Sequence, residues 1–149
     1  MTGSTATPRA VWERAQACIH VRDVDGYAGL FAPDGVQSLP FAIPGMPAEI
    51  RGPDEIRARI GPALRDAVAA GRRNIGNDNV VVHETADPEV IVVEFDLLGE
   101  DGRGGTYRLP YIHVLRVRDG RIVSLRDYID TLAMTRVIGA ATTPGPTGP

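Results

Sequence analysis

The sequence has only one cysteine, Cys18, among its 149 residues. An intramolecular disulfide needs two cysteines and a cysteine-ligated zinc site needs several, so both are excluded. No neighbouring residue suggests an activated thiolate, and we expect Cys18 to be an ordinary core residue. A lone cysteine also suits a reducing compartment.

Long basic runs are absent as well. The 16 basic residues are scattered along the chain, and the formal net charge is −3. Nucleic-acid-binding domains usually carry a basic patch. We therefore do not expect nucleic acid as a partner.

The chain also lacks membrane and cofactor signals. No apolar stretch reaches the roughly 18 residues of a membrane span, and the N-terminus has no signal-peptide pattern, so we expect a cytoplasmic protein without a membrane partner. Phosphate-binding loops, dinucleotide fingerprints and metal motifs are missing, and we expect no cofactor and no metal. Glu94, Asp96 and His113 could ligate a metal ion, but residues alternating along strands are a weak signal for one.

The composition does suit one globular domain. Hydrophobic residues make up 43% of the chain and charged residues 23%, which is typical of folded proteins. We expect a single domain over residues 8–140. Residues 1–7 and 141–149 are rich in small residues, glycine and proline and are predicted to be flexible termini.

Helices are predicted in the first half of the chain. Thr7 and Pro8 have the pattern of a helix start, with Thr7 as the N-cap. A short second helix follows Asp23. A third begins at Gly52, is interrupted at Gly61-Pro62 and continues to Gly71.

Strands are predicted in the second half, at residues 80–82, 90–98, 108–117 and 122–129. Turn residues separate them, and Asp119-Gly120 is a strong hairpin signal. Helices followed by an antiparallel meander predict an α+β fold. In it, N-terminal helices cover a cone-shaped, curved antiparallel sheet and enclose one deep pocket.

Apolar strand faces interrupted by polar residues indicate where this pocket lies, because alternate side chains share a face. We assign five polar residues to the concave, helix-covered side: Glu94, Asp96, Tyr111, His113 and Asp127. Buried acids must pair, accept hydrogen bonds or hold a proton. Three acids near one histidine can do all of these.

The back of the sheet is then expected to be apolar. Its residues would be Ile91, Val93, Phe95, Ile112 and Val114. A second copy of the chain is the simplest cover for such a face, so we predict a homodimer through the sheet.

Structural explanations compete with these functional ones. Asp127 could pair with an arginine at the rim, and Glu94 could form a salt bridge with a helix arginine. His113 could be a satisfied core histidine bonded to Glu94 or Tyr111. Tyr111 is expected to be a pocket wall that hydrogen-bonds one of the acids.

Three segments, residues 26–35, 51–56 and 117–130, resemble the nuclear transport factor 2-like superfamily, and the likeness covers roughly residues 8–138. Its SnoaL-like group includes polyketide cyclases, and the superfamily includes ketosteroid isomerases, limonene epoxide hydrolase and the phenazine-biosynthesis A/B proteins. The resemblance implies a cone-shaped pocket between a curled sheet and helices. It does not select one chemistry, because this fold hosts many.

The resemblance to limonene epoxide hydrolase implies a catalytic acid at Asp127 and a second at Asp96. The arginine between that enzyme's two acids falls on Glu94 here, and its water-holding Tyr and Asn fall on Gln37 and Leu39. The water-activating set is therefore broken.

In the phenazine proteins, a glutamate that acts as an acid occupies the position of Asp127. The loop at residues 39–45 also looks closer to theirs than to that of the hydrolase. The oxyanion-hole tyrosine and the base of the steroid isomerases fall near Ala15 and Leu39, which speaks against steroid isomerisation.

Together these observations predict a cofactor-free acid/base enzyme for a small apolar metabolite of polyketide-like specialised biosynthesis, acting by cyclisation, isomerisation or epoxide opening. Asp127 would be the principal proton donor, assisted by Asp96 and His113. The predicted substrate contacts are Tyr111, Glu94, Leu125, Ile129, Leu39, Phe41 and Leu109. The alternatives are a non-catalytic binding or interaction module of the same fold, and a dimer whose pocket is filled by its own side chains.

Overall fold

A computed structural model describes residues 5–41 and 43–142. The predicted termini lie partly outside this range, at residues 1–4 and 143–149. Four helices and six strands follow one another in the described residues: α1 (Pro8–His20), α2 (Val24–Gly29), β1 (Phe31–Ser38), β2 (Glu49–Arg51), α3 (Gly52–Ala69), β3 (Arg73–Glu84), β4 (Val90–Glu100), β5 (Thr106–Arg118), β6 (Arg121–Ile129) and α4 (Thr131–Thr142).

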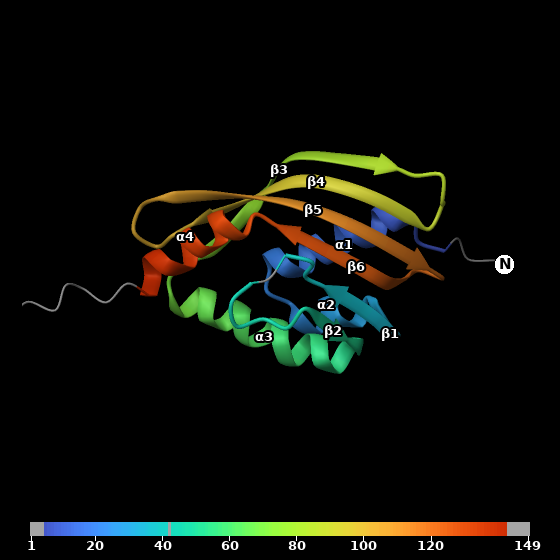
Figure 1. Cartoon of the computed structure of the whole chain (residues 1–149), viewed down its shortest axis with the longest axis horizontal. Coiled ribbons are helices and arrows are strands. Elements are labelled where there is room, and N and C mark those ends of the chain that lie inside the picture. Colours follow the sequence, from blue (N-terminus) through green and yellow to red (C-terminus); the bar gives the residue numbers. More distant parts are fainter. Residues whose placement is uncertain (1–4, 42, 143–149) are drawn as a thin grey trace, which may run out of the picture.

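The strands form one curved sheet in the order β2-β1-β6-β5-β4-β3 (Figure 1). The expected α+β class is confirmed. The sheet is mixed rather than antiparallel throughout, because β1 pairs in parallel with β6. The predicted meander accounts for β3 to β6, whose neighbours are all antiparallel.

The predicted helix starts agree with the structure. The Thr7 hydroxyl oxygen accepts a hydrogen bond from the backbone N–H of Ala10 at 3.2 Å, and Asp23 caps α2 through the N–H of Gly26 at 2.8 Å. The predicted break at Gly61-Pro62 is wrong, because α3 runs through Pro62. Helix packing around it outweighs the roughly 3 kcal/mol that an interior proline costs.

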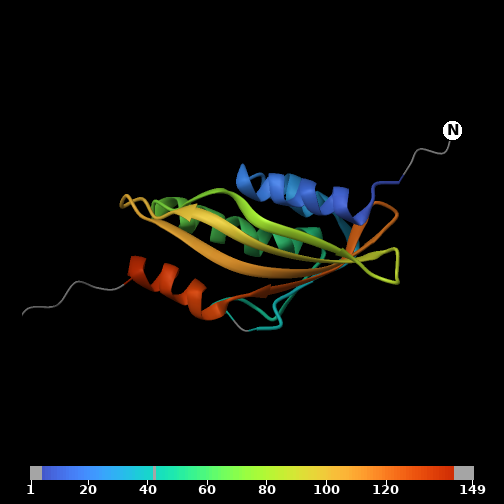
Figure 2. The same ribbon diagram turned by 90° about the horizontal axis from the view of Figure 1, so that it is seen from above.

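The sheet arches over α1, α2 and α3 (Figure 1). Seen from above, α1 lies on the β3 side of the sheet and α4 on the β6 side (Figure 2). The core fills the space between sheet and helices, and its fully buried side chains include Val11, Phe31, Ile50, Ile56, Val93, Leu115 and Ile122. No helix among the described residues is long and apolar enough to cross a lipid bilayer.

The register between β4 and β5 corrects the predicted faces. Val93 pairs with His113 and Phe95 pairs with Tyr111, so these residues share the concave face. Glu94 pairs with Ile112 on the outer face. Alternation within each strand is as expected, but a shift of one residue between strands exchanges the two faces.

The prediction of an apolar outer face of the sheet is therefore wrong. Ile91, Val93 and Phe95 belong to the buried core. Ile112 and Val114 lie on the outer face, which they share with the charged side chains of β4.

Candidate functional site

A mostly apolar cavity of about 270 Å³ opens between the concave face of the sheet, α3 and α4. Its volume lies just below the range of drug-sized ligand sites. Apolar side chains form most of the wall, including Leu39, Met46, Ile60, Ala63, Leu97, Leu109, Ile129, Met134 and Val137. The polar groups at its inner end come from one hydrogen-bonded chain.

That chain joins five buried side chains from α1, α2, β1, β5 and β6. The indole Nε1–H of Trp12 donates to Nδ1 of His113 at 3.0 Å. Nε2 of His113 lies 3.1 Å from Oδ1 of Asp127. The Gln37 amide N–H donates to Oδ2 of Asp127 at 3.2 Å, and the Tyr27 hydroxyl donates to the Gln37 amide oxygen at 2.8 Å.

Trp12 determines the tautomer of His113. An indole nitrogen can only donate, so Nδ1 of His113 must be the acceptor and carries no proton. The proton of the neutral ring then sits on Nε2 and points at Asp127. Protonation at Nδ1 would place two N–H groups against each other and break the bond to Trp12.

Asp127 consequently accepts hydrogen bonds on both carboxyl oxygens, one from His113 and one from Gln37. Asp127 is 8% exposed and lines the cavity. Each of its oxygens keeps a further lone pair for a ligand.

Tyr111 forms the wall beside this acid. Its ring stacks on Phe95 with centroids 5.2 Å apart, and Phe95 also meets the ring of His113 edge-on at 4.8 Å. Burial and the nearby charge of Asp127 raise the pKa of Tyr111, so its hydroxyl stays protonated. Within the described residues that hydroxyl has no protein partner, which leaves it free to donate to a ligand.

Six of the predicted site residues line the cavity: Asp127, His113, Tyr111, Leu39, Leu109 and Ile129. The structure brings Asp127 and His113 into contact. The alternative pairing of Asp127 with an arginine at the rim is absent among the described residues, and neither Glu94 nor Tyr111 is the hydrogen-bond partner of His113.

Glu94 and Asp96 do not belong to the cavity, and their predicted placement there is wrong. Glu94 pairs with His83 at 2.6 Å on the outer face. Asp96 accepts from Asn79 and Arg108 at 2.9 and 2.8 Å, and these hydrogen bonds lower its pKa. Both acids lie across the sheet from His113, so these three side chains cannot ligate one metal ion.

Phe41 and Leu125 are also outside the cavity wall. Phe41 is 56% exposed and contacts the ring of Tyr128 on the outer face. Leu125 faces inward as predicted, but it is buried in the core.

Three members of the chain were not predicted: Trp12, Tyr27 and Gln37. Gln37 gave one usable signal, a lone amide in a strand beside apolar residues, and such a group needs buried partners. Trp12 and Tyr27 gave no comparable signal, since large aromatic residues on short amphipathic helices normally indicate only core packing.

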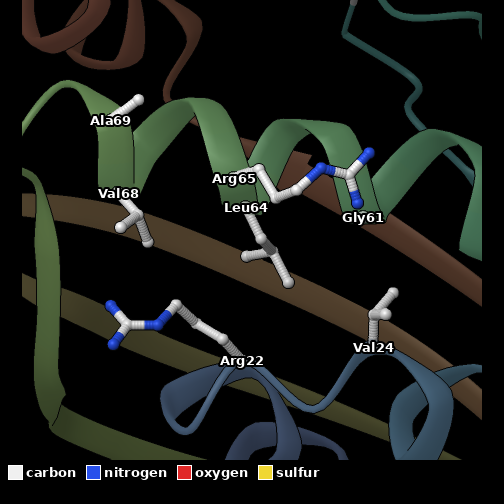
Figure 3. A pocket seen from close by; sticks show the side chains of 7 residues that line it. All are labelled: Arg22, Val24, Gly61, Leu64, Arg65, Val68 and Ala69. Atoms are coloured by element: carbon white, nitrogen blue, oxygen red, sulfur yellow. The ribbon is translucent and has the colours of Figure 1, made fainter.

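A second, larger hollow of about 420 Å³ lies between α3 and the residues that join α1 to α2 (Figure 3). Aliphatic carbons and two arginines, Arg22 and Arg65, form its walls. Its lining residues include no acid, histidine or hydroxyl group. Of these two cavities, the first is therefore the better candidate for proton transfer.

Comparison with known proteins agrees with this architecture. The SnoaL-like domain model matches residues 12–125. The chain belongs to this family. The family therefore accounts for the cone of helices and sheet, while the matched stretch ends two residues before Asp127.

Individual relatives share the fold along most of their length. A PhzA/B-like protein of Pseudomonas aeruginosa is 32% identical over 121 residues, which cover 78% of this chain and 79% of the relative. A Bacillus subtilis structure provisionally named an isomerase has a TM-score of 0.74 at 27% identity, covering 89% of this chain and 92% of its own. A phenazine biosynthesis-related protein of Pseudomonas aeruginosa shares the fold, with a TM-score of 0.58, 23% identity and 95% coverage of both chains.

Proposed function

We propose that this SnoaL-like protein is a cofactor-free acid/base enzyme that moves a proton on a small, mostly apolar carbonyl compound. The proposal rests on one observation. The buried carboxylate Asp127 lies in the wall of an apolar cavity and is held by a histidine of fixed tautomer. Isomerisation and ring closure of a polyketide-like metabolite both begin with such a transfer. The provisional name of the Bacillus subtilis structure, an isomerase, supports this class of reaction.

Asp127 starts as the proton acceptor in this proposal, which changes the order expected from the sequence. Both of its carboxyl oxygens accept N–H groups, and in this proposal it acts as a carboxylate that first removes a proton from the carbon next to the substrate carbonyl. The Tyr111 hydroxyl donates a hydrogen bond to the oxygen on which negative charge develops. Asp127, now protonated, returns the proton at a second position.

His113 acts as a positioning residue. Its Nε2–H orients one oxygen of Asp127, and Trp12 prevents the ring from taking up a proton at Nδ1 while that bond persists. The role expected of His113, assistance to Asp127, thus becomes one of orientation. Asp96 has no place in the proposal because it lies on the outer face.

The test is deuterium exchange, which needs no knowledge of the natural substrate. The protein is incubated in deuterated water with 2-tetralone, a small apolar ketone, and NMR measures exchange next to the carbonyl. We expect Asp127→Asn to slow the catalysed exchange by about 100-fold or more. Asp96→Asn is the matched control, and its rate should equal that of the wild type.

Equal rates with wild type and Asp127→Asn would contradict the proposal. Saturable binding of the ketone without any catalysed exchange would favour the second candidate, a small-molecule-binding module. The apolar cavity supports this second candidate, because a small apolar molecule could bind there without reacting.

A homodimer through the sheet remains a prediction. The outer face exposes 42% of Ile112 and 47% of Val81, and self-association would cover both. Light scattering during gel filtration measures the mass in solution. A monomer at all concentrations would contradict the dimer without affecting the proposed chemistry.

A further inference from the structure

The far end of the cavity is built where the end of α3 meets the turn between β4 and β5. Gly71, with φ +78°, ends the helix, and a Cβ atom on Gly102 would lie 2.6 Å from the carbonyl oxygen of Gly71. Only glycines permit this approach of two backbone segments. Arg72 follows directly and is held by a backbone hydrogen bond to Ala67 at 2.8 Å.

Arg72 is the one arginine among the residues that line the cavity. It is half-buried, and its guanidinium group forms no ion pair or hydrogen bond within the part of the chain that the structure describes. Its neighbour Arg73 differs, since its side chain is exposed and pairs with Glu100 at 2.9 Å. Arg72 therefore brings an uncompensated positive charge to the cavity.

Two further polar side chains converge on the same end. Asn74, Gly99 and Tyr107 form one row across β3, β4 and β5. Because Gly99 has no side chain, the ring of Tyr107 lies over it, within 2.1 to 2.4 Å of where a Cβ atom would stand. Among the described residues, neither the Tyr107 hydroxyl nor the Asn74 amide has a side-chain hydrogen-bond partner.

This polar end is separated from Asp127 by apolar wall. Along β5, Tyr107 and His113 lie six positions apart, a backbone distance of roughly 20 Å at about 3.3 Å per residue. Leu97 and Leu109 pair in between and both line the cavity. A ligand that fills the cavity thus meets a carboxylate at one end, aliphatic carbons in the middle and a cation at the other end.

We infer that Arg72, Asn74 and Tyr107 form a subsite for the carboxylate of the substrate, which makes the substrate a keto acid whose apolar body separates the reacting carbonyl from the carboxylate. This inference rests on the proposed function, which places the reacting carbonyl near Asp127. A guanidinium group matches the planar, two-oxygen geometry of a carboxylate. Burial raises the pKa of Tyr107, so its hydroxyl remains a donor for the same group.

The experiment compares two probes by calorimetric titration: 4-oxo-4-phenylbutanoate and its methyl ester, which lacks the charge and carries one additional methyl group. Wild type should bind the acid about 10- to 100-fold more tightly than the ester, as expected for a charge-assisted pair. Arg72→Gln should abolish this preference and leave ester affinity unchanged, which also shows that the cavity is intact. Arg73→Gln, the matched control, should keep the preference.

Equal affinities of wild type for acid and ester, or no measurable binding of the acid, would overturn the subsite. An equal loss of both probes in Arg72→Gln would do the same. Failure of the proposed function is distinguishable, because it appears as acid-selective, Arg72-dependent binding without deuterium exchange. Conversely, deuterium exchange on 2-tetralone without any preference for the acid would support the proposed function and contradict the carboxylate subsite.

Discussion

Trp12 and His113 lie 101 positions apart in the sequence, and the indole N–H of Trp12 donates to Nδ1 of His113 at 3.0 Å. Trp12 does not line the cavity, yet its contact determines that the nitrogen of His113 that faces Asp127 carries the proton. It couples the first helix to the central strand and to the candidate acid.

The first prediction concerns this contact. Trp12→Phe leaves Nδ1 of His113 without a donor, so the Nδ1-protonated form should join the Nε2–H form in ¹⁵N NMR spectra of the ring. The free energy of unfolding should fall by at least about 1 kcal/mol, because a buried polar atom loses its partner. Tyr27→Phe removes the hydrogen bond at the opposite end and should keep a single tautomer. One unchanged tautomer in Trp12→Phe would refute the assignment.

Asp127→Asn should remain folded. The amide can accept from His113 and donate to Gln37 if Gln37 turns over and Tyr27 reverses its role, so each buried group keeps a partner. Asp127→Leu leaves two buried N–H groups without acceptors and should cost at least about 2 kcal/mol. Urea unfolding measures both variants, and similar losses would show that the hydrogen-bonded chain cannot reverse.

Gly99→Ala should displace the ring of Tyr107, because a Cβ atom there would lie 2.1 Å from its Cζ. The expected loss in the free energy of unfolding is about 1 to 3 kcal/mol. The matched control is Gly29→Ala in α2, where nothing lies within 4 Å of the added atom. In a Tyr107→Ala background the cost of Gly99→Ala should largely vanish, and an undiminished cost would contradict the contact.

Stability should depend on pH through Glu89. Hydrogen bonds from Arg118 and Arg116 lower its pKa from 4.5 to about 2. A lowered pKa means that this stabilisation is present above about pH 4.5 and is lost as the pH falls toward 2. Urea unfolding of wild type and Glu89→Gln should differ at neutral pH and converge near pH 2. A difference that does not change with pH would contradict the pairing.

Much of the fold was predictable from local signals. Caps at Thr7 and Asp23 determine where helices begin, and these signals act within a few residues. The strand β2 and the parallel pairing of β1 with β6 were not predictable, because they depend on contacts between distant parts of the chain. Tertiary packing likewise overrides the proline within α3.

The candidate site was predictable only in part, for the same physical reason. Asp127, His113 and Tyr111 could be found as polar residues on apolar strand faces. Glu94 and Asp96 were misplaced because alternation says nothing about the register between two strands. A better criterion was present, since the wholly apolar face with Val93 and Phe95 gains most from contact with the helices.

One residue separates the end of β6, the strand that carries Asp127, from the start of α4, and this helix supplies Met134 and Val137 to the cavity wall. It contributes no member of the hydrogen-bonded chain from Trp12 to Tyr27. It also lies beyond the stretch that the family model matches. Substitutions in α4 can therefore change the size of the ligand that fits the cavity without altering the side chains that hold Asp127. Evolution or redesign can vary the one while the other stays intact.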